Sequence, residues 1–355
     1  MKVLCLVPYP TVAPSNRLRV EQYLPALRAR GIQGTVRPFI DSARFYALSQ
    51  RSGQFLAKAA HFLAATARRL ADLRRADGYD LVLVHREAFP VGPAWVESWL
   101  TRRGIPLVYD FDDAIYLPHS HPAHQLLRWM KAPGKVVAII RQRRRIIAGN
   151  SYLAAFARHH NPRVVIIPTP VDTDRIRPVA RAPRGPVTLG WMGTATTAPY
   201  LGLLDTVWPL LGERERVALR VVGGSYRADG IGTTESPWTL EGEAAHLQAF
   251  DIGLAPMPDT AWTRGKCAFK VIQYMAAGLP VIASPVGAQG EVVRDGVTGF
   301  FATTAEEWVA RIQTLVRNPD LRREMGMRGR ALVENEYSLR ATLPRFATAL
   351  EEAGR

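Results

Sequence analysis

The chain of 355 residues has little cysteine and no long apolar run. Its two cysteines, Cys5 and Cys267, lie far apart in sequence, so we expect neither a disulfide framework nor a cysteine-based metal site. No stretch of about eighteen consecutive apolar residues exists, which argues against a transmembrane helix. The N-terminus MKVLCLVPYP enters an apolar segment without a cationic leader or cleavage site, so we expect no signal peptide. Together these absences predict a cytoplasmic location.

Positive charge is abundant and unevenly distributed. The formal net charge is +15, from 46 Lys and Arg residues against 31 Asp and Glu residues. Residues 1–184 hold 29 basic and 12 acidic residues (net +17), whereas residues 185–355 hold 17 and 19 (net −2). A basic half indicates an anionic partner: a membrane surface, a phosphorylated lipid or nucleic acid. Nucleic acid is disfavoured, because no helix-turn-helix, zinc or RNP-like pattern with interleaved aromatics is present.

One predicted helix, Gln54–Arg75, carries much of this charge. Leu56, Leu63, Ala67 and Leu70 fall on one face of it. The basic residues beside that face, and those of a second basic run, are Arg68, Arg69, Arg74, Arg75 and Arg141–Arg145. A basic amphipathic helix can lie on an anionic membrane. The alternative is a helix packed on its own sheet with a solvated arginine face.

Short apolar strands alternate with helical segments along the chain, which predicts parallel, doubly wound sheets. The predicted strands are Lys2–Pro8, Gly34–Phe39, Leu81–His85, Pro106–Tyr109, Arg145–Ala148, Val164–Ile167, Val187–Trp191, Ala218–Val222, Trp238–Leu240, Ile252–Ala255, Val281–Ala283 and Gly299–Phe301. A segment rich in Pro and Arg divides them. We therefore expect an N-terminal domain over 1–178, a linker over 179–186, a C-terminal domain over 187–335 and a terminal helix over 336–355 that packs back on the N-terminal domain.

The most informative segment is Gly265–Gly287, GKCAFKVIQYMAAGLPVIASPVG, with two lysines at the start of a helix and a buried strand after it. A polar helix start at the edge of a parallel sheet is typical of a site for a phosphate-bearing ligand. Three segments precede it: GWMGT at 190–194, WTLEGE at 238–243 and FDIGLAPMP at 250–258. GWMGT provides a glycine turn that phosphate could approach, and the alternative is an ordinary turn between a strand and a loop. WTLEGE provides an aromatic and two carboxylates that could line a nucleobase pocket, and the alternative is a solvated turn.

In order and spacing these segments, with EVVRDGVTGFF at 291–301, resemble the donor-binding half of retaining glycosyltransferases of the GT-B fold, family 4 (group 1 glycosyltransferases). The resemblance is strongest to a bacterial branch with a GK-x-x-x-K-x-x-QYMA segment. It implies an α/β architecture of two doubly wound, Rossmann-like domains facing a central cleft. It also implies transfer of a sugar, with retention, from a nucleoside diphosphate sugar to a hydroxyl of a lipid-linked or polysaccharide acceptor. No metal or other cofactor is expected.

The resemblance also assigns the donor site. Family members carry two glutamates separated by seven residues, which hold the transferred sugar and the ribose, but Gly265 and Gln273 stand at these positions here. Gln273 can still hydrogen-bond ribose hydroxyls. Lys266 and Lys270 are expected to neutralise the diphosphate with the helix N-terminus, the alternative being two solvated lysines. The predicted donor-binding residues are Arg17, Gly193, Thr194, Trp238, Glu241, Lys266, Cys267, Ala268, Lys270 and Gln273.

The first half is then expected to bind the acceptor. The segment YDFDDAIY at 109–116 places aspartates at the end of a strand. We predict that Asp112 and Asp113 position the acceptor or the sugar, with helix capping as the alternative. His85 and Arg86 follow another strand end and complete the set of catalytic candidates. Two other functions stay open: a nucleotide-sugar epimerase of the same fold, and a non-catalytic binding protein with a degenerate donor site.

Overall fold

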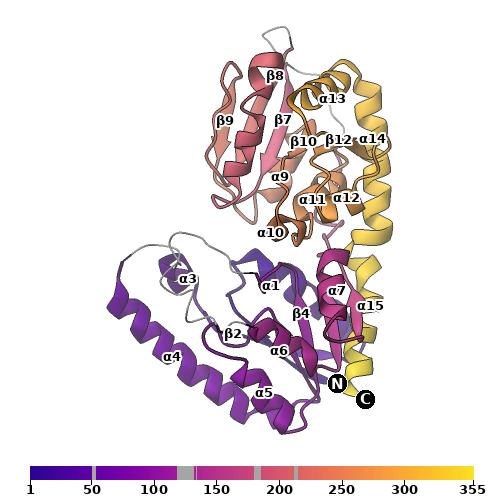
Figure 1. The fold of residues 1–355 in the computed structure, drawn as a ribbon. Helices are drawn as coiled ribbons and strands as arrows, with labels where there is room; N and C mark the ends of the chain where they lie inside the picture. Colours follow the sequence, from indigo (N-terminus) through magenta and orange to yellow (C-terminus); the bar gives the residue numbers. More distant parts are fainter. Residues whose placement is uncertain (50–52, 118–131, 133, 180–184, 212–214) are drawn as a thin grey trace. The chain divides into compact units, whose positions relative to one another are not determined.

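Each of two units of the chain is built around its own six-stranded, parallel sheet (Figure 1). The computed structural model describes residues 1–49, 53–117, 132, 134–179, 185–211 and 215–355, so most of the predicted linker over 179–186 lies outside the described residues. Unit 1 consists of Met1–Thr169 and Thr342–Arg355, and unit 2 consists of Pro170–Ala341.

The sheet of unit 1 has the strand order β2-β1-β3-β4-β5-β6. The strands are β1 (Lys2–Val7), β2 (Gln33–Pro38), β3 (Leu81–His85), β4 (Leu107–Phe111), β5 (Arg145–Ala148) and β6 (Val164–Ile166). All six predicted strands are present, with small displacements of their ends. Every residue of β3 and β4 is buried, which explains why these strands read as continuous apolar runs. The helices are α1 (Pro14–Arg19), α2 (Leu24–Ala29), α3 (Ala43–Ser49), α4 (Phe55–Arg74), α5 (Trp95–Arg102), α6 (Lys135–Arg141), α7 (Ser151–Arg158) and α15 (Leu339–Gly354).

The segment after β1 forms the short helix α1, which contains Arg17 and begins at Pro14. Proline is well suited to a first helical position because its φ angle is already helical and its missing N–H has no partner there. A 3₁₀ turn, Glu21–Tyr23, follows α1 and leads into α2, whose first turn contains Pro25.

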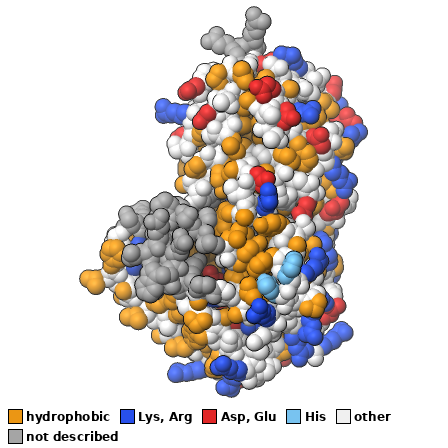
Figure 2. Space-filling view, viewed as in Figure 1, with side chains coloured by type: hydrophobic (Ala, Val, Ile, Leu, Met, Phe, Trp, Pro, Cys, Tyr) orange, Lys and Arg blue, Asp and Glu red, His pale blue; other side chains and the backbone are white. Residues whose placement is uncertain are grey.

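The helix predicted over Gln54–Arg75 is confirmed as α4. Its leucine face is exposed, and the face with Ala65, Arg69 and Leu73 is buried. Leu56, Leu63 and Leu70 are 89%, 69% and 42% exposed. Arg69 is buried instead and donates to the carbonyls of Arg37 (3.1 Å) and Val7 (3.3 Å). Burial lowers the pKa of Arg69 to about 10. Apolar side chains accordingly reach the surface along the edge where Figure 1 places α4 (Figure 2). Within the described ranges, no helix is long and apolar enough to cross a membrane.

The sheet of unit 2 has the order β12-β11-β10-β7-β8-β9. Its strands are β7 (Val187–Met192), β8 (Val217–Val222), β9 (Thr233–Ser236), β10 (Ile252–Ala255), β11 (Val281–Ala283) and β12 (Gly299–Phe301). Five match the prediction, but the strand expected at Trp238–Leu240 is wrong. The edge strand β9 lies earlier and ends before Pro237, which has no N–H to continue the ladder.

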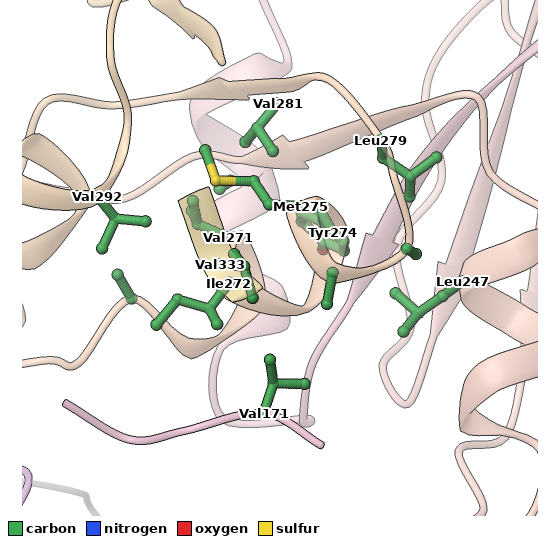
Figure 3. Close-up of a cluster of buried hydrophobic side chains, with 14 of the residues drawn as sticks. Val171, Leu247, Val271, Ile272, Tyr274, Met275, Leu279, Val281, Val292 and Val333 are labelled. Carbon is green, nitrogen blue, oxygen red and sulfur yellow. The ribbon is translucent and has the colours of Figure 1, made fainter. Parts of the chain in front are cut away.

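The helices of unit 2 include α8 (Val207–Leu211), α9 (Glu243–Gln248), α10 (Ala261–Arg264), α11 (Phe269–Ala276), α12 (Ala288–Val292), α13 (Ala305–Arg317) and α14 (Pro319–Leu332). Helix α11 lies inside the core, where Val271, Ile272 and Met275 are fully buried (Figure 3). The hydroxyl of Tyr274 accepts from the backbone N–H of Met192 at 2.9 Å. This bond ties α11 to the end of the central strand β7.

A close approach between α14 and the turn after α11 generates a stability prediction. A Cβ added at Gly326 would lie 2.0 Å from the carbonyl oxygen of Gly278, and a backbone atom cannot easily move aside. We expect Gly326→Ala to lower the free energy of unfolding of unit 2 by about 1–3 kcal/mol in urea denaturation. The control is Gly232→Ala, where no heavy atom lies within 4 Å of the new Cβ. Equal stability of the two variants would contradict the packing.

Candidate functional site

The loops after β7 and β8 meet at the carboxyl edge of the unit 2 sheet. The N–H of Gly193 donates to the carbonyl of Val222 at 2.9 Å. Gly223 has a φ angle of +77°, and a Cβ there would lie 2.3 Å from the Gly193 carbonyl oxygen. A Cβ at Gly193 would lie 2.7 Å from Cε of Lys270. Glycine at both positions therefore allows two loops and a lysine to converge where α/β sheets bind their ligands.

Lys270 is the most unusual side chain at this edge. Its Nζ lies 5.2 Å from the ring centroid of Trp191 and donates to Oγ1 of Thr197 at 3.1 Å. Burial, and to a lesser extent the positive charge of Lys266, lower the pKa of Lys270 to about 7. In the described part of the chain, no carboxylate forms an ion pair with it. A partly buried ammonium beside a second cation is suited to an anionic ligand.

The N-terminus of α11 adds to this positive potential. Ala268, just before the helix, has φ +51° and ψ +25°, a left-handed conformation that is uncommon for alanine. No described side chain caps the helix. The first N–H groups of a helix carry partial positive charge, and here they lie in the segment that also contains Lys266, Cys267 and Lys270. Cys267 and Ala268 are both buried, so they shape this turn through packing.

Gln273, predicted to meet the ribose, is paired with a residue that the sequence analysis missed. Its Nε2 donates to Oε1 of Glu243 at 2.9 Å, and both side chains are buried. Arg175 lies on the other carboxylate oxygen at 3.4 Å. Glu241, the residue predicted from the same WTLEGE segment, is exposed. The signal for Glu243 in the sequence is its place as an acidic residue in the first turn of α9, and its side chain is buried.

The remaining donor candidates of unit 2 lie around the converging loops. Thr194 is exposed, and its hydroxyl is 2.8 Å from that of Thr196. Trp238 is half-buried and packs against the core beside Gly223. The structure therefore brings Gly193, Trp238 and Lys270 together at one edge.

In unit 1, the predicted pair Asp112 and Asp113 is bound by Arg86. Nε of Arg86 donates to Asp112 at 2.8 Å, and Nη2 donates to Asp113. Burial would raise the pKa of Asp112, but the Arg86 guanidinium outweighs it and holds that pKa well below the usual range. Two carboxylates that share one guanidinium are poor general bases. Among the described residues, no group of three His, Cys, Asp or Glu side chains is arranged to hold a metal ion.

His85 does not reach the surface as expected, because its side chain is fully buried. Its Nδ1 lies 2.6 Å from Oδ2 of Asp110, and its Nε2 lies 2.7 Å from Oγ of Ser15. Arg19 holds the same Asp110 through both of its oxygens. Burial opposes ionisation of Asp110, yet Arg19 and the hydrogen bond from His85 lower its pKa. Arg17, on α1, is half-buried.

Part of the chain is similar in sequence to known proteins. Residues 186–318 match the family model described as "Glycosyl transferases group 1". A stretch of 84 residues is 30% identical to trehalose synthase of Pyrococcus horikoshii, covering 24% of this chain and 20% of that protein. The chain therefore matches about a fifth of the length of that curated relative.

Solved structures resemble the whole chain. Sucrose-phosphate synthase from Thermosynechococcus elongatus is 17% identical with a TM-score of 0.71, and the match covers 99% of both chains. HepE from Anabaena, solved in complex with UDP and glucose, is 14% identical with a TM-score of 0.69 over 99% of both chains. At these identities the likeness shows the fold. The predicted GT-B fold is confirmed, and the residues that match the group 1 glycosyltransferase model, 186–318, lie in unit 2.

Lys270 generates a prediction about stability and pH. Its pKa is about 7 in the folded chain and about 10.5 when unfolded, so the unfolded chain binds more protons between these values. Stability should therefore rise as pH increases from about 7 to about 10.5. We expect Lys270→Met to raise the melting temperature at pH 7 by roughly 2–4 °C. The variant should also show a smaller increase in stability between about pH 7 and pH 10.5 than the wild type.

A second buried lysine provides the contrast. Lys135 of unit 1 is paired with Glu87 at 2.8 Å, so Lys135→Met should lower the melting temperature by leaving that carboxylate without its cation. Differential scanning calorimetry from pH 6 to 10 measures both effects. A lower melting temperature for Lys270→Met at pH 7 would show that its ammonium is well stabilised in the unliganded protein.

Proposed function

We propose that this chain is a retaining glycosyltransferase that moves a sugar from a nucleoside diphosphate sugar to a hydroxyl acceptor. The observation that carries the proposal is the cation pair Lys266 and Lys270, which lies at the carboxyl edge of unit 2 within residues that match group 1 glycosyltransferases. Negative charge develops on the leaving diphosphate as the glycosidic bond breaks. Cations held beside it in a partly dehydrated site stabilise that charge in the transition state.

In this mechanism the lysines and the N-terminus of α11 neutralise the charge of the leaving diphosphate, and no metal ion is required. Attack by the acceptor hydroxyl on the face that the diphosphate leaves, guided by the departing phosphate oxygen, gives retention without a protein nucleophile. The glycine turn at Gly193 lets backbone N–H groups approach the phosphates. Gly265 offers only its backbone to the transferred sugar.

Gln273 and Glu243 are proposed to hold the ribose. The hydrogen bond to Glu243 fixes the direction of the Gln273 amide, so its Oε1 is the acceptor that a ribose hydroxyl meets. The carboxylate absent from α11 is thus replaced by one from α9, and Arg175 balances its charge. The epimerase alternative needs an accessible histidine–carboxylate pair, whereas the pair of His85 and Asp110 is fully buried.

Helix α4 supports an acceptor at a membrane. Its leucine stripe, Leu56, Leu63 and Leu70, faces outward, and the exposed Arg68 and Arg74 lie on the same helix. We propose that this stripe enters the interface of an anionic bilayer while the arginines meet lipid phosphates, at about 1 kcal/mol per basic residue near the surface. The enzyme would then work at the cytoplasmic face on a lipid-linked or polysaccharide precursor.

The donor site is tested by nucleotide release from a panel of UDP-, GDP- and ADP-sugars, with and without membrane lipid extract. We expect one donor class to turn over, and Lys266→Ala or Lys270→Ala to lower kcat about 10²- to 10³-fold, since each removes a cation from the leaving group. Lys2→Ala, at the exposed start of β1, is the control. If the wild-type protein turns over no donor and no nucleotide shifts its melting temperature, the proposed glycosyltransferase activity is refuted. If both lysine variants keep full activity, the proposed role of Lys266 and Lys270 at the diphosphate is refuted.

The membrane surface is tested by co-sedimentation with vesicles of phosphatidylcholine, with and without phosphatidylglycerol. We expect binding only to the anionic vesicles, and at least a tenfold loss when Leu56, Leu63 and Leu70 are all changed to Ser, because apolar area no longer enters the interface. The control changes Leu203 and Leu210 of unit 2, which are 47% and 55% exposed, to Ser. Equal losses in both variants would contradict a docking role for α4.

A further inference from the structure

A chain of four hydrogen-bonded side chains ends at the carboxyl edge of the unit 1 sheet. Arg19 of α1 donates to both oxygens of Asp110 in β4. Asp110 lies 2.6 Å from Nδ1 of His85 in β3, and Nε2 of His85 lies 2.7 Å from Oγ of Ser15 in α1. Arg19, Asp110 and His85 are no more than 1% exposed, whereas Ser15 is partly exposed. Of these four side chains, only that of Ser15 is therefore accessible to a ligand.

The inner end of this hydrogen-bonded series determines which ring nitrogen of His85 donates to Asp110. Two donated hydrogen bonds from Arg19 keep Asp110 a carboxylate, which can only accept. His85 must then donate from Nδ1, and in the neutral form of its ring a lone pair lies at Nε2. In that form the hydroxyl of Ser15 donates to Nε2. Ser15 consequently presents only oxygen lone pairs outward, so a neutral ligand group must donate to it.

The ion pairs beside Ser15 carry no excess positive charge. The charges of Arg19 and Asp110 cancel, and the adjacent group of Arg86, Asp112 and Asp113 carries a net charge of −1. A phosphate or carboxylate oxygen at Ser15 would meet only lone pairs of Oγ and could not form a hydrogen bond with it. A sugar or lipid hydroxyl can donate without electrostatic cost.

We propose that Ser15 binds the acceptor hydroxyl, and that His85 and Asp110 are positioning residues that fix its polarity. This inference rests on the proposed glycosyl transfer. The acceptor O–H donates to Oγ of Ser15, which leaves the lone pairs of the acceptor oxygen directed away from Ser15 and available for attack on the sugar. As the acceptor oxygen attacks, its proton passes to the departing phosphate oxygen, and the protonation of Ser15, His85 and Asp110 does not change.

The polarity is tested without turnover by NMR of the full chain labelled with ¹⁵N-histidine. The expected spectrum near pH 7.5 shows His85 as the neutral tautomer protonated at Nδ1, with an Nε2 resonance that moves in Ser15→Ala. Titration with octyl β-D-glucoside, galactoside and mannoside should perturb that Nε2 resonance for at least one glycoside. An imidazolium, an Nε2–H tautomer, or no response to any glycoside overturns the inference.

The acceptor role is tested by comparing transfer to the same glycosides with donor cleavage by water. We expect Ser15→Ala to lower kcat/KM for the glycoside about 10- to 100-fold while hydrolysis is unchanged, because only transfer uses the hydrogen bond. Ser15→Thr should restore transfer, and His85→Asn, which can donate to Asp110 but cannot accept from Ser15, should impair it. Ser98→Ala in α5 is the matched control.

The outcomes separate this inference from the proposed function. Parallel loss of hydrolysis and transfer in Ser15→Ala, or unchanged transfer, overturns the acceptor role even if the enzyme is active. A wild-type chain that cleaves no donor refutes the proposed function. In that case the glycoside-dependent NMR response still decides whether Ser15 binds a hydroxyl.

Discussion

The ammonium of Lys270 is the group on which the account of this chain depends. It lies over the indole of Trp191, beside Lys266, with its stem against Gly193, and its pKa is lowered to about 7. A cation in such surroundings destabilises the fold unless a ligand supplies the missing charge. The glycines of the converging loops and the uncapped N-terminus of α11 are arranged around the same point. The edge of unit 2 is thus organised for an anion.

In unit 1, by contrast, two arginines at the sheet edge, one buried and one half-buried, are paired with carboxylates. Arg19 is balanced by Asp110, and Arg86 by Asp112 and Asp113. What this edge offers a ligand is a polarised hydroxyl, Ser15, rather than an uncompensated ion. In the proposed function, unit 2 binds the diphosphate and unit 1 binds the acceptor hydroxyl, and these are the two binding functions that sugar transfer needs.

Much of the fold could be predicted from the sequence, because fully buried parallel strands leave continuous apolar runs. The failures have local causes. Pro14 and Pro25 lie in the first turns of short helices that apolar periodicity does not reveal, and Pro237 ends a polar edge strand that apolarity could not reveal. The site was predicted where its residues are close in sequence, as in the lysine segment. Pairs from distant elements, such as Glu243 with Gln273 or Ser15 with His85, left no spacing signal.

The central claim is that Lys270 binds a nucleoside diphosphate as a cation. Isothermal titration calorimetry with UDP, GDP and ADP near pH 8, in buffers of different ionisation enthalpy, tests it directly. An anion beside Lys270 raises its pKa, so the protein should take up protons on binding, and Lys270→Met should lose both the uptake and most of the affinity. Binding of a nucleotide with no proton uptake, and with equal affinity in Lys270→Met, would contradict the account.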